Sequence, residues 1–75
     1  MFRWTVEASI KGRIVVRETF DSEKEAKEEF EALCFDNKVS RETPGPGMTL
    51  YDDIELYKQN TDTGEILEKK VRSFR

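Results

Sequence analysis

Apolar and polar side chains alternate along residues 2–20, and this alternation constrains the fold more than any other feature of the chain. Even positions are apolar from Phe2 to Phe20, with Glu18 as the one clear exception. A period of two indicates strands that bury one face. The segment therefore predicts an antiparallel hairpin that turns at Gly12.

The position of Gly12 narrows the choice of turn. Loops of residues 10–12 and of residues 11–13 both keep the apolar side chains on one face, whereas a two-residue loop would mix the faces. The first of these pairs Ala8 with Ile14 and places the glycine at the left-handed position of a type I turn with a bulge. We therefore predict the 10–12 loop.

A helix is predicted to follow the hairpin. Ser22 and Glu25 have the spacing of a capping box, and Asp21 is an alternative cap. Most of the following positions are Glu, Lys or Asp, so one face of the helix over residues 22–37 is solvated. The opposite face carries an apolar stripe at helical spacing: Ala26, Phe30, Leu33 and Cys34.

The second half of the chain predicts a loop and another hairpin. Residues 39–50 form the loop, because Pro44-Gly45-Pro46-Gly47 continues neither a helix nor a strand. Alternation resumes in residues 54–74, on both sides of a turn at residues 61–64. This turn predicts four cross-strand pairs: Ile54 with Val71, Lys58 with Leu67, Glu55 with Lys70, and Asp53 with Arg72.

The predicted elements give a single small domain over residues 1–75. Its class is α+β with the order ββαββ, and one amphipathic helix packs on a four-stranded antiparallel sheet. Four strands make a sheet about 19 Å wide, at ~4.8 Å per strand. One helix with its side chains is only about 10–12 Å across. The helix is therefore too narrow to cover the predicted buried face: Phe2, Trp4, Val6, Ala8, Ile14, Val16, Ile54, Leu56, Leu67 and Val71.

The uncovered part of that face needs another covering element. Three candidates remain open: the 39–50 loop with Val39, Met48 and Leu50, a second copy of the chain, or a different protein. A core of this size contributes only about 3–5 kcal/mol, so an uncovered strip matters for stability.

Composition argues against catalysis. The 75 residues include one cysteine and no histidine, which excludes catalytic triads, histidine proton shuttles and nearly all zinc sites. Cys34 lies late in an acidic helix, on the apolar stripe, so we expect a buried core residue and not a reactive thiol. We therefore expect a protein that is not an enzyme and that has no catalytic residues, no metal and no cofactor.

Sequence also bears on localisation. No apolar stretch is long enough to span a membrane, and the N-terminus lacks the apolar block of a signal peptide. The lone cysteine suits a reducing compartment. We expect a soluble cytoplasmic protein.

Two polar features are candidate ligand sites. The acidic cluster of Asp52, Asp53 and Glu55 is better explained as strand-edge charge than as a cation site, because the spacing matches no calcium loop. The loop at 44–47 is better explained as a stiff connector than as an anion cradle. Residues around this loop and on the next strand form the candidate interaction surface: Met48, Tyr51, Tyr57 and Arg41.

Charge is unevenly distributed along the chain. Residues 1–20 carry a net charge of +2, residues 21–38 carry −4, and the remainder carries −1. The hairpin-then-helix stretch from Phe2 to Leu33, with its glycine turn, Thr19-Phe20 and Glu25-Ala26, is loosely similar to the sheet-reading DNA-binding modules of phage integrase arms and AP2-type domains. The predicted register, independently of this resemblance, puts basic side chains on the sheet face away from the helix and so predicts nucleic-acid contacts there. The candidate contacts are Arg3, Arg13, Arg17, Lys70 and Arg72.

Two functional hypotheses follow. The first is a small protein-interaction module, for example an accessory or inhibitor protein, whose partner is another protein or a second copy of itself. The second is a nucleic-acid-binding module that uses a basic outer sheet face with aromatic residues.

Overall fold

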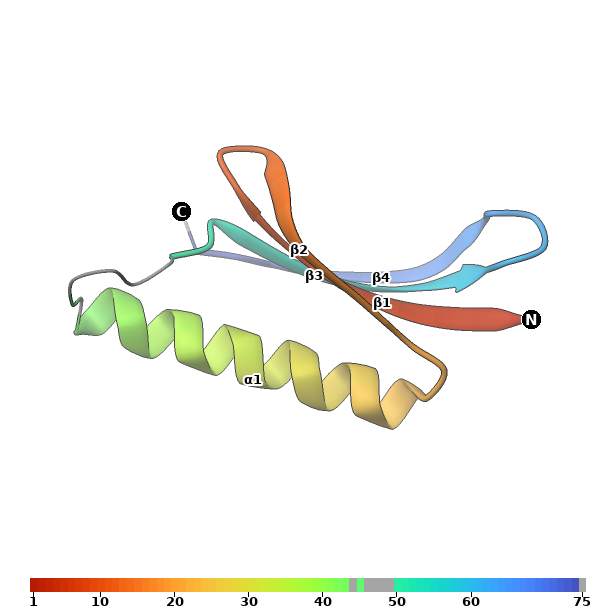
Figure 1. Cartoon of the computed structure of the whole chain (residues 1–75), viewed down its shortest axis with the longest axis horizontal. Coiled ribbons are helices and arrows are strands. Elements are labelled where there is room, and N and C mark those ends of the chain that lie inside the picture. Colours follow the sequence, from red (N-terminus) through yellow and green to blue (C-terminus); the bar gives the residue numbers. More distant parts are fainter. Residues whose placement is uncertain (44, 46–49, 75) are drawn as a thin grey trace.

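The fold has the predicted ββαββ order and α+β class. A computed structural model describes residues 1–43, 45 and 50–74. The four strands form one antiparallel sheet in the order β2-β1-β3-β4, and the helix packs on one of its faces (Figure 1). The elements are β1 (Phe2–Ile10), β2 (Arg13–Phe20), α1 (Glu23–Glu42), β3 (Asp53–Asn60) and β4 (Ile66–Ser73).

The first hairpin turns through two residues, so the predicted 10–12 loop is wrong. Ile10 pairs with Arg13, and the turn consists of Lys11 and Gly12 alone. Both turn residues have positive φ, 53° and 79° respectively. A two-residue turn with two positive φ angles matches the right-handed twist of the flanking strands.

A β-bulge resolves the mixing of faces that a two-residue turn would cause. Ser9 pairs with Ile14, but the next residue of β1, Ala8, pairs with Val16. Val15 is thus an extra residue on β2. The extra residue returns Val16 to the helix-facing side, where it packs against the core, while Ile14 lies across from Ser9 and is exposed.

The second hairpin has the predicted turn but not the predicted register. The amide of Asn60 donates to the carbonyl of Glu65 (2.9 Å), which closes the loop of residues 61–64. Gln59 then pairs with Ile66 and Lys58 with Glu68, so Leu67 is a bulge residue.

This bulge moves the rest of β4 by one position. Ile54 pairs with Arg72 and Leu56 with Lys70, whereas Val71 lies across from Glu55. All four predicted pairs in this hairpin are therefore wrong. Lys70 and Arg72 lie on the helix-facing side, and Val71 lies on the outer face of the sheet.

Helix α1 begins where predicted and ends later. The side-chain oxygen of Ser22 accepts a hydrogen bond from the Glu25 amide (3.4 Å), as expected of an N-cap. The helix extends to Glu42 instead of ending near residue 37, and the Thr43 amide bonds to the Val39 carbonyl at its end.

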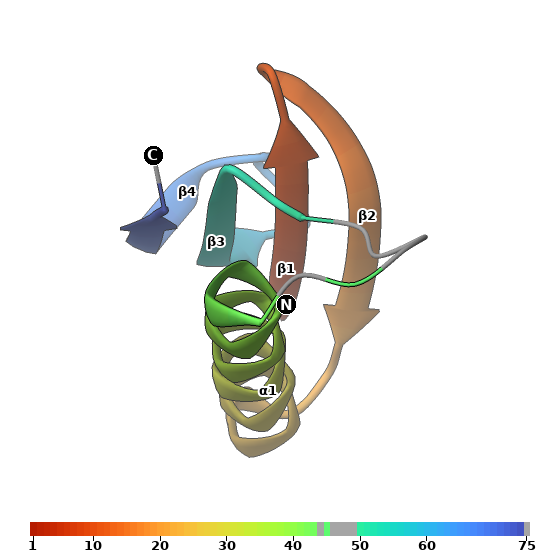
Figure 2. The same ribbon diagram turned by 90° about the vertical axis from the view of Figure 1, so that its left-hand side faces the viewer.

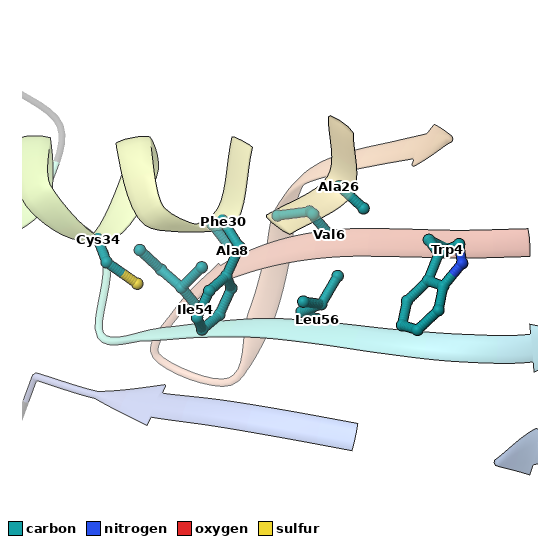
Figure 3. Close-up of a cluster of buried hydrophobic side chains, with 8 residues drawn as sticks. All are labelled: Trp4, Val6, Ala8, Ala26, Phe30, Cys34, Ile54 and Leu56. Atoms are coloured by element: carbon teal, nitrogen blue, oxygen red, sulfur yellow. The ribbon is translucent and has the colours of Figure 1, made fainter. Parts of the chain in front are cut away.

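The core lies between α1 and the two central strands. Figure 3 shows the helix side chains pointing toward β1 and β3. Phe30, Ile54 and Val6 are the largest fully buried side chains. The buried cluster consists of Trp4, Val6, Ala8, Ala26, Phe30, Cys34, Ile54 and Leu56.

The helix covers the middle of the sheet and leaves β4 open. Figure 2 shows α1 beneath β1 and β3, with β2 and β4 extending to either side. Every residue of β4 is exposed. Four residues expected in the core are exposed instead: Phe2, Ile14, Leu67 and Val71.

We predict that Gly12→Val destabilises the first hairpin. The space around Gly12 is open, so the cost comes from forcing a β-branched residue to a φ of 79°. Such backbone strain costs about 1–3 kcal/mol, which a thermal melt measures as a lower Tm. Gly12→Asn is the matched control, because asparagine tolerates the left-handed region and should lower the Tm less. An equal loss in both variants would contradict the turn assignment.

Candidate functional site

The predicted interaction residues do not form one surface. Tyr51 and Arg41 lie together at the C-terminal end of α1, where the Arg41 side chain donates to the Tyr51 carbonyl (2.8 Å). Tyr57 pairs with Thr5 on the outer face of the sheet, away from the helix. Met48 lies outside the described residues.

The Asn37 side chain forms hydrogen bonds between α1 and the segment that leads into β3. Its side-chain oxygen accepts from the Tyr51 amide (2.8 Å), and its side-chain nitrogen donates to the Tyr51 carbonyl (2.9 Å). Asn37 is only 2% exposed. Sequence reasoning missed this residue, although it continues the spacing of Phe30 and Cys34 along the helix and so marks a polar residue on the buried stripe.

Arg41 and Asp52 extend this connection and therefore have structural roles. Asp52 accepts from Arg41 (3.3 Å) and from the backbone amide of Lys11 in the first turn (2.7 Å). The Arg41 guanidinium also lies 6.0 Å from the centre of the Phe74 ring. The predicted acidic cluster is accordingly divided, since Asp52 supports these contacts while Glu55 pairs with Lys69 (3.5 Å) on the outer face.

A groove runs between α1 and β4 where the helix leaves the sheet uncovered. One hollow of about 190 Å³ is lined by Cys34 and Phe35 of the helix and by Arg72 of β4. Phe35 is 66% exposed, and Val39 is exposed one turn further along. We call Phe35, Val39, Lys38, Lys70 and Arg72 the α1–β4 surface.

The α1–β4 surface is cationic although the whole chain carries a net charge of −3. Lys70 reaches across the groove, 5.3 Å from the centre of the Phe30 ring and 3.9 Å from the Glu31 carboxylate. Lys38 and Arg72 line the same hollow as Glu31. Three cations therefore surround one carboxylate at this site.

The five predicted nucleic-acid contacts lie on two faces of the sheet. Arg3 and Arg17 line a cleft on the outer face. Lys70 and Arg72 pair with Leu56 and Ile54, whose buried side chains face the helix. Arg13 pairs with Ile10 at the hairpin end, also on the helix-facing side by strand alternation. The expectation of a shared basic outer face is therefore wrong.

Acidic side chains are interspersed with the cations of the outer face. Glu7 lies between Arg17 and Glu55 in adjacent strands and is only 6% exposed. The Arg17 Nε donates to its carboxylate at 2.5 Å, and this hydrogen bond raises the pKa of Arg17 above its ordinary value. Glu55 in turn pairs with Lys69. Each of the two carboxylates, Glu7 and Glu55, is thus paired with a cation of the adjacent edge strand.

Cys34 is a buried core residue, as predicted. Its side chain points toward Ile54 (Figure 3) and is 6% exposed. Burial raises the pKa of its thiol above the ordinary value, and the nearby Arg72 charge opposes this shift. Within residues 1–43, 45 and 50–74, no cluster of acidic and cysteine side chains could hold a metal ion. No helix in the same residues has the length and apolar character needed to cross a membrane.

No known protein family, curated protein or solved structure matches this chain.

We predict that Asn37→Ala loosens the segment that enters β3. Two buried hydrogen bonds are lost, at a cost of about 1–3 kcal/mol in the free energy of unfolding. Hydrogen exchange should speed up most at the Tyr51 amide, which loses its acceptor. The exposed neighbour Asp36→Ala is the control. A uniform effect over the whole sheet would contradict the proposed local connection.

We predict that the Cys34 thiol resists modification in the native protein. Its burial and raised pKa both lower the concentration of accessible thiolate. A colorimetric disulfide reagent at pH 8 should react slowly with the folded chain and at once after addition of denaturant. Rapid reaction without denaturant would show that the helix does not cover this position.

Proposed function

We propose that this chain is a small, non-enzymatic protein-interaction module that binds a partner protein at the α1–β4 surface. The observation that carries the proposal is the exposure of Phe35, an aromatic side chain beside a hollow lined by Lys38 and Arg72. The lack of histidine and the burial of Cys34 support a role without catalysis.

The composition of this surface suits a protein contact. Aromatic and arginine side chains dominate the energetic centres of protein interfaces, and lysines and carboxylates more often form the rim. Full burial of one phenylalanine contributes about 1.5–3 kcal/mol. Phe35 can therefore supply a large share of the affinity of a transient complex, with Val39 beside it on the helix.

Charge indicates the chemistry of the partner. Lys38, Lys70 and Arg72 surround Glu31, so a segment that carries apolar residues with acidic neighbours would complement the site. A second copy is a poorer fit, because a two-fold axis through Phe35 would bring these cations close to their own equivalents. The proposed partner is thus a different protein with an acidic, partly apolar segment.

Nucleic acid is the second hypothesis, and the charge pattern along α1 supports it less. The first half of α1 carries five acidic side chains, which would repel a phosphate backbone that extended along the helix. The basic residues of the two sheet faces also do not form a continuous stripe. The acidic helix residues are Glu23, Glu25, Glu28, Glu29 and Glu31.

The experiment is selection from a displayed library of random linear peptides. We expect enrichment of peptides in which a large apolar residue is flanked by Asp or Glu. Phe35→Ser should weaken the binding of a selected peptide at least about tenfold, the equivalent of ~1.4 kcal/mol. Phe35 is exposed, so this variant should keep the wild-type Tm.

Ile14→Ser is the matched control, because Ile14 is an exposed apolar residue on the far hairpin. It should leave peptide binding unchanged. Equal binding by the Phe35 variant would overturn the proposal. Salt-sensitive binding of a random duplex, lost on mutation of Arg3 and Arg17 or of Lys70 and Arg72, would favour the nucleic-acid hypothesis instead.

A further inference from the structure

The outer face of the sheet holds a polar cleft that the proposed interaction surface does not use. Both hairpin ends turn away from the helix (Figure 1), and the cleft lies on that side of the sheet. Its volume is about 430 Å³, within the range of small-molecule sites. The lining includes Arg3, Thr5, Arg17, Thr19, Tyr57 and Gln59.

Strand register explains why these side chains converge. Thr5 of β1 lies between Thr19 of β2 and Tyr57 of β3, so three hydroxyl groups form one row across the sheet. Arg3 lies two residues before Thr5 on the same face of β1. Arg17 lies two residues before Thr19 on β2. The two guanidinium groups therefore come from different strands, on opposite sides of the hydroxyl row.

Each guanidinium group has a carboxylate beside its Nε. The Arg17 Nε donates to the buried Glu7 carboxylate, and the Arg3 Nε lies 3.9 Å from Asp21. Among the described residues, the terminal nitrogens of both side chains donate no hydrogen bond. Buried Glu7 thus fixes Arg17 in place and leaves its paired terminal N–H groups for a ligand.

We propose that this cleft binds the phosphate group of a small molecule. Guanidinium and hydroxyl donors that approach from several directions suit a tetrahedral phosphate better than a planar carboxylate. The Gln59 amide nitrogen donates to the Gly64 carbonyl at 3.0 Å, which leaves its side-chain oxygen as an acceptor for ligand hydroxyls.

Acidic side chains near the cleft favour a small ligand over a polymer. Asp21 lies beside Arg3, and Glu7 lies beside Arg17, so carboxylates flank the two cations that line the cleft. Glu55 lies across from Glu7 in the next strand. A phosphate backbone that extended beyond the cleft would approach these carboxylates, whereas a single phosphate group would not.

The test is a titration of ¹⁵N-labelled full-length protein with inorganic phosphate and ribose 5-phosphate as probes. We expect saturable amide shifts centred on Thr5, Thr19 and Tyr57. Arg3→Gln and Thr19→Val should each weaken binding, the first by about tenfold or more because it removes a charge-assisted hydrogen bond. Arg13→Gln, on the helix-facing side, is the matched control and should bind as the wild type does.

Three results would overturn the proposal. One is the absence of saturable shifts with both probes. Another is equal affinity in the Arg3→Gln variant, with a wild-type spectrum that shows the fold to be intact. The third is tighter binding of malate or of a single-stranded oligonucleotide at the same residues, which would assign the cleft to carboxylates or to nucleic acid.

Discussion

The packing of α1 on the two central strands is the contact on which the rest of this structure depends. Phe30 of α1, Val6 of β1 and Ile54 of β3 belong to one buried cluster, and they are the largest fully buried side chains among the described residues. The order β2-β1-β3-β4 puts β1 and β3 at the centre of the sheet, so each hairpin contributes one central strand and one edge strand. The helix therefore joins two hairpins that pair with each other only through β1 and β3.

The width of one helix then determines what is left exposed. A helix covers about 10–12 Å, roughly the width of two strands at ~4.8 Å spacing. β4 stays open on the helix-facing side, where Phe35 and Arg72 line the groove. The outer face has no covering element among the described residues, and Arg3 and Arg17 line its cleft. Both proposed binding sites result from the same limited coverage.

Alternation and capping were sufficient to predict the order of elements, the start of the helix and the core of β1 and β3. They could not predict the two bulges, because an extra residue such as Val15 or Leu67 depends on how two strands fit together. Each bulge changes which residues share a face, and this moved Lys70 and Arg72 to the helix-facing side. The candidate sites were therefore predicted less well than the fold.

The connection at Asn37 shows a second limit of sequence reasoning. A polar residue on an apolar helical stripe signals a buried hydrogen bond, but its partner at Tyr51 lies across the loop and has no local signature. The same connection explains why α1 continues past residue 37 to Glu42. Arg41, one turn after Asn37, also donates a hydrogen bond to the Tyr51 carbonyl.

We propose that the α1–β4 surface binds a different protein and is not covered by a second copy of the chain. Sedimentation equilibrium of the wild type and of Phe35→Ser tests it most directly. We expect both to be monomers at the same concentrations, with unchanged mass. A wild-type dimer that the Phe35 substitution dissociates would contradict the account, because it would show that self-association already buries this surface.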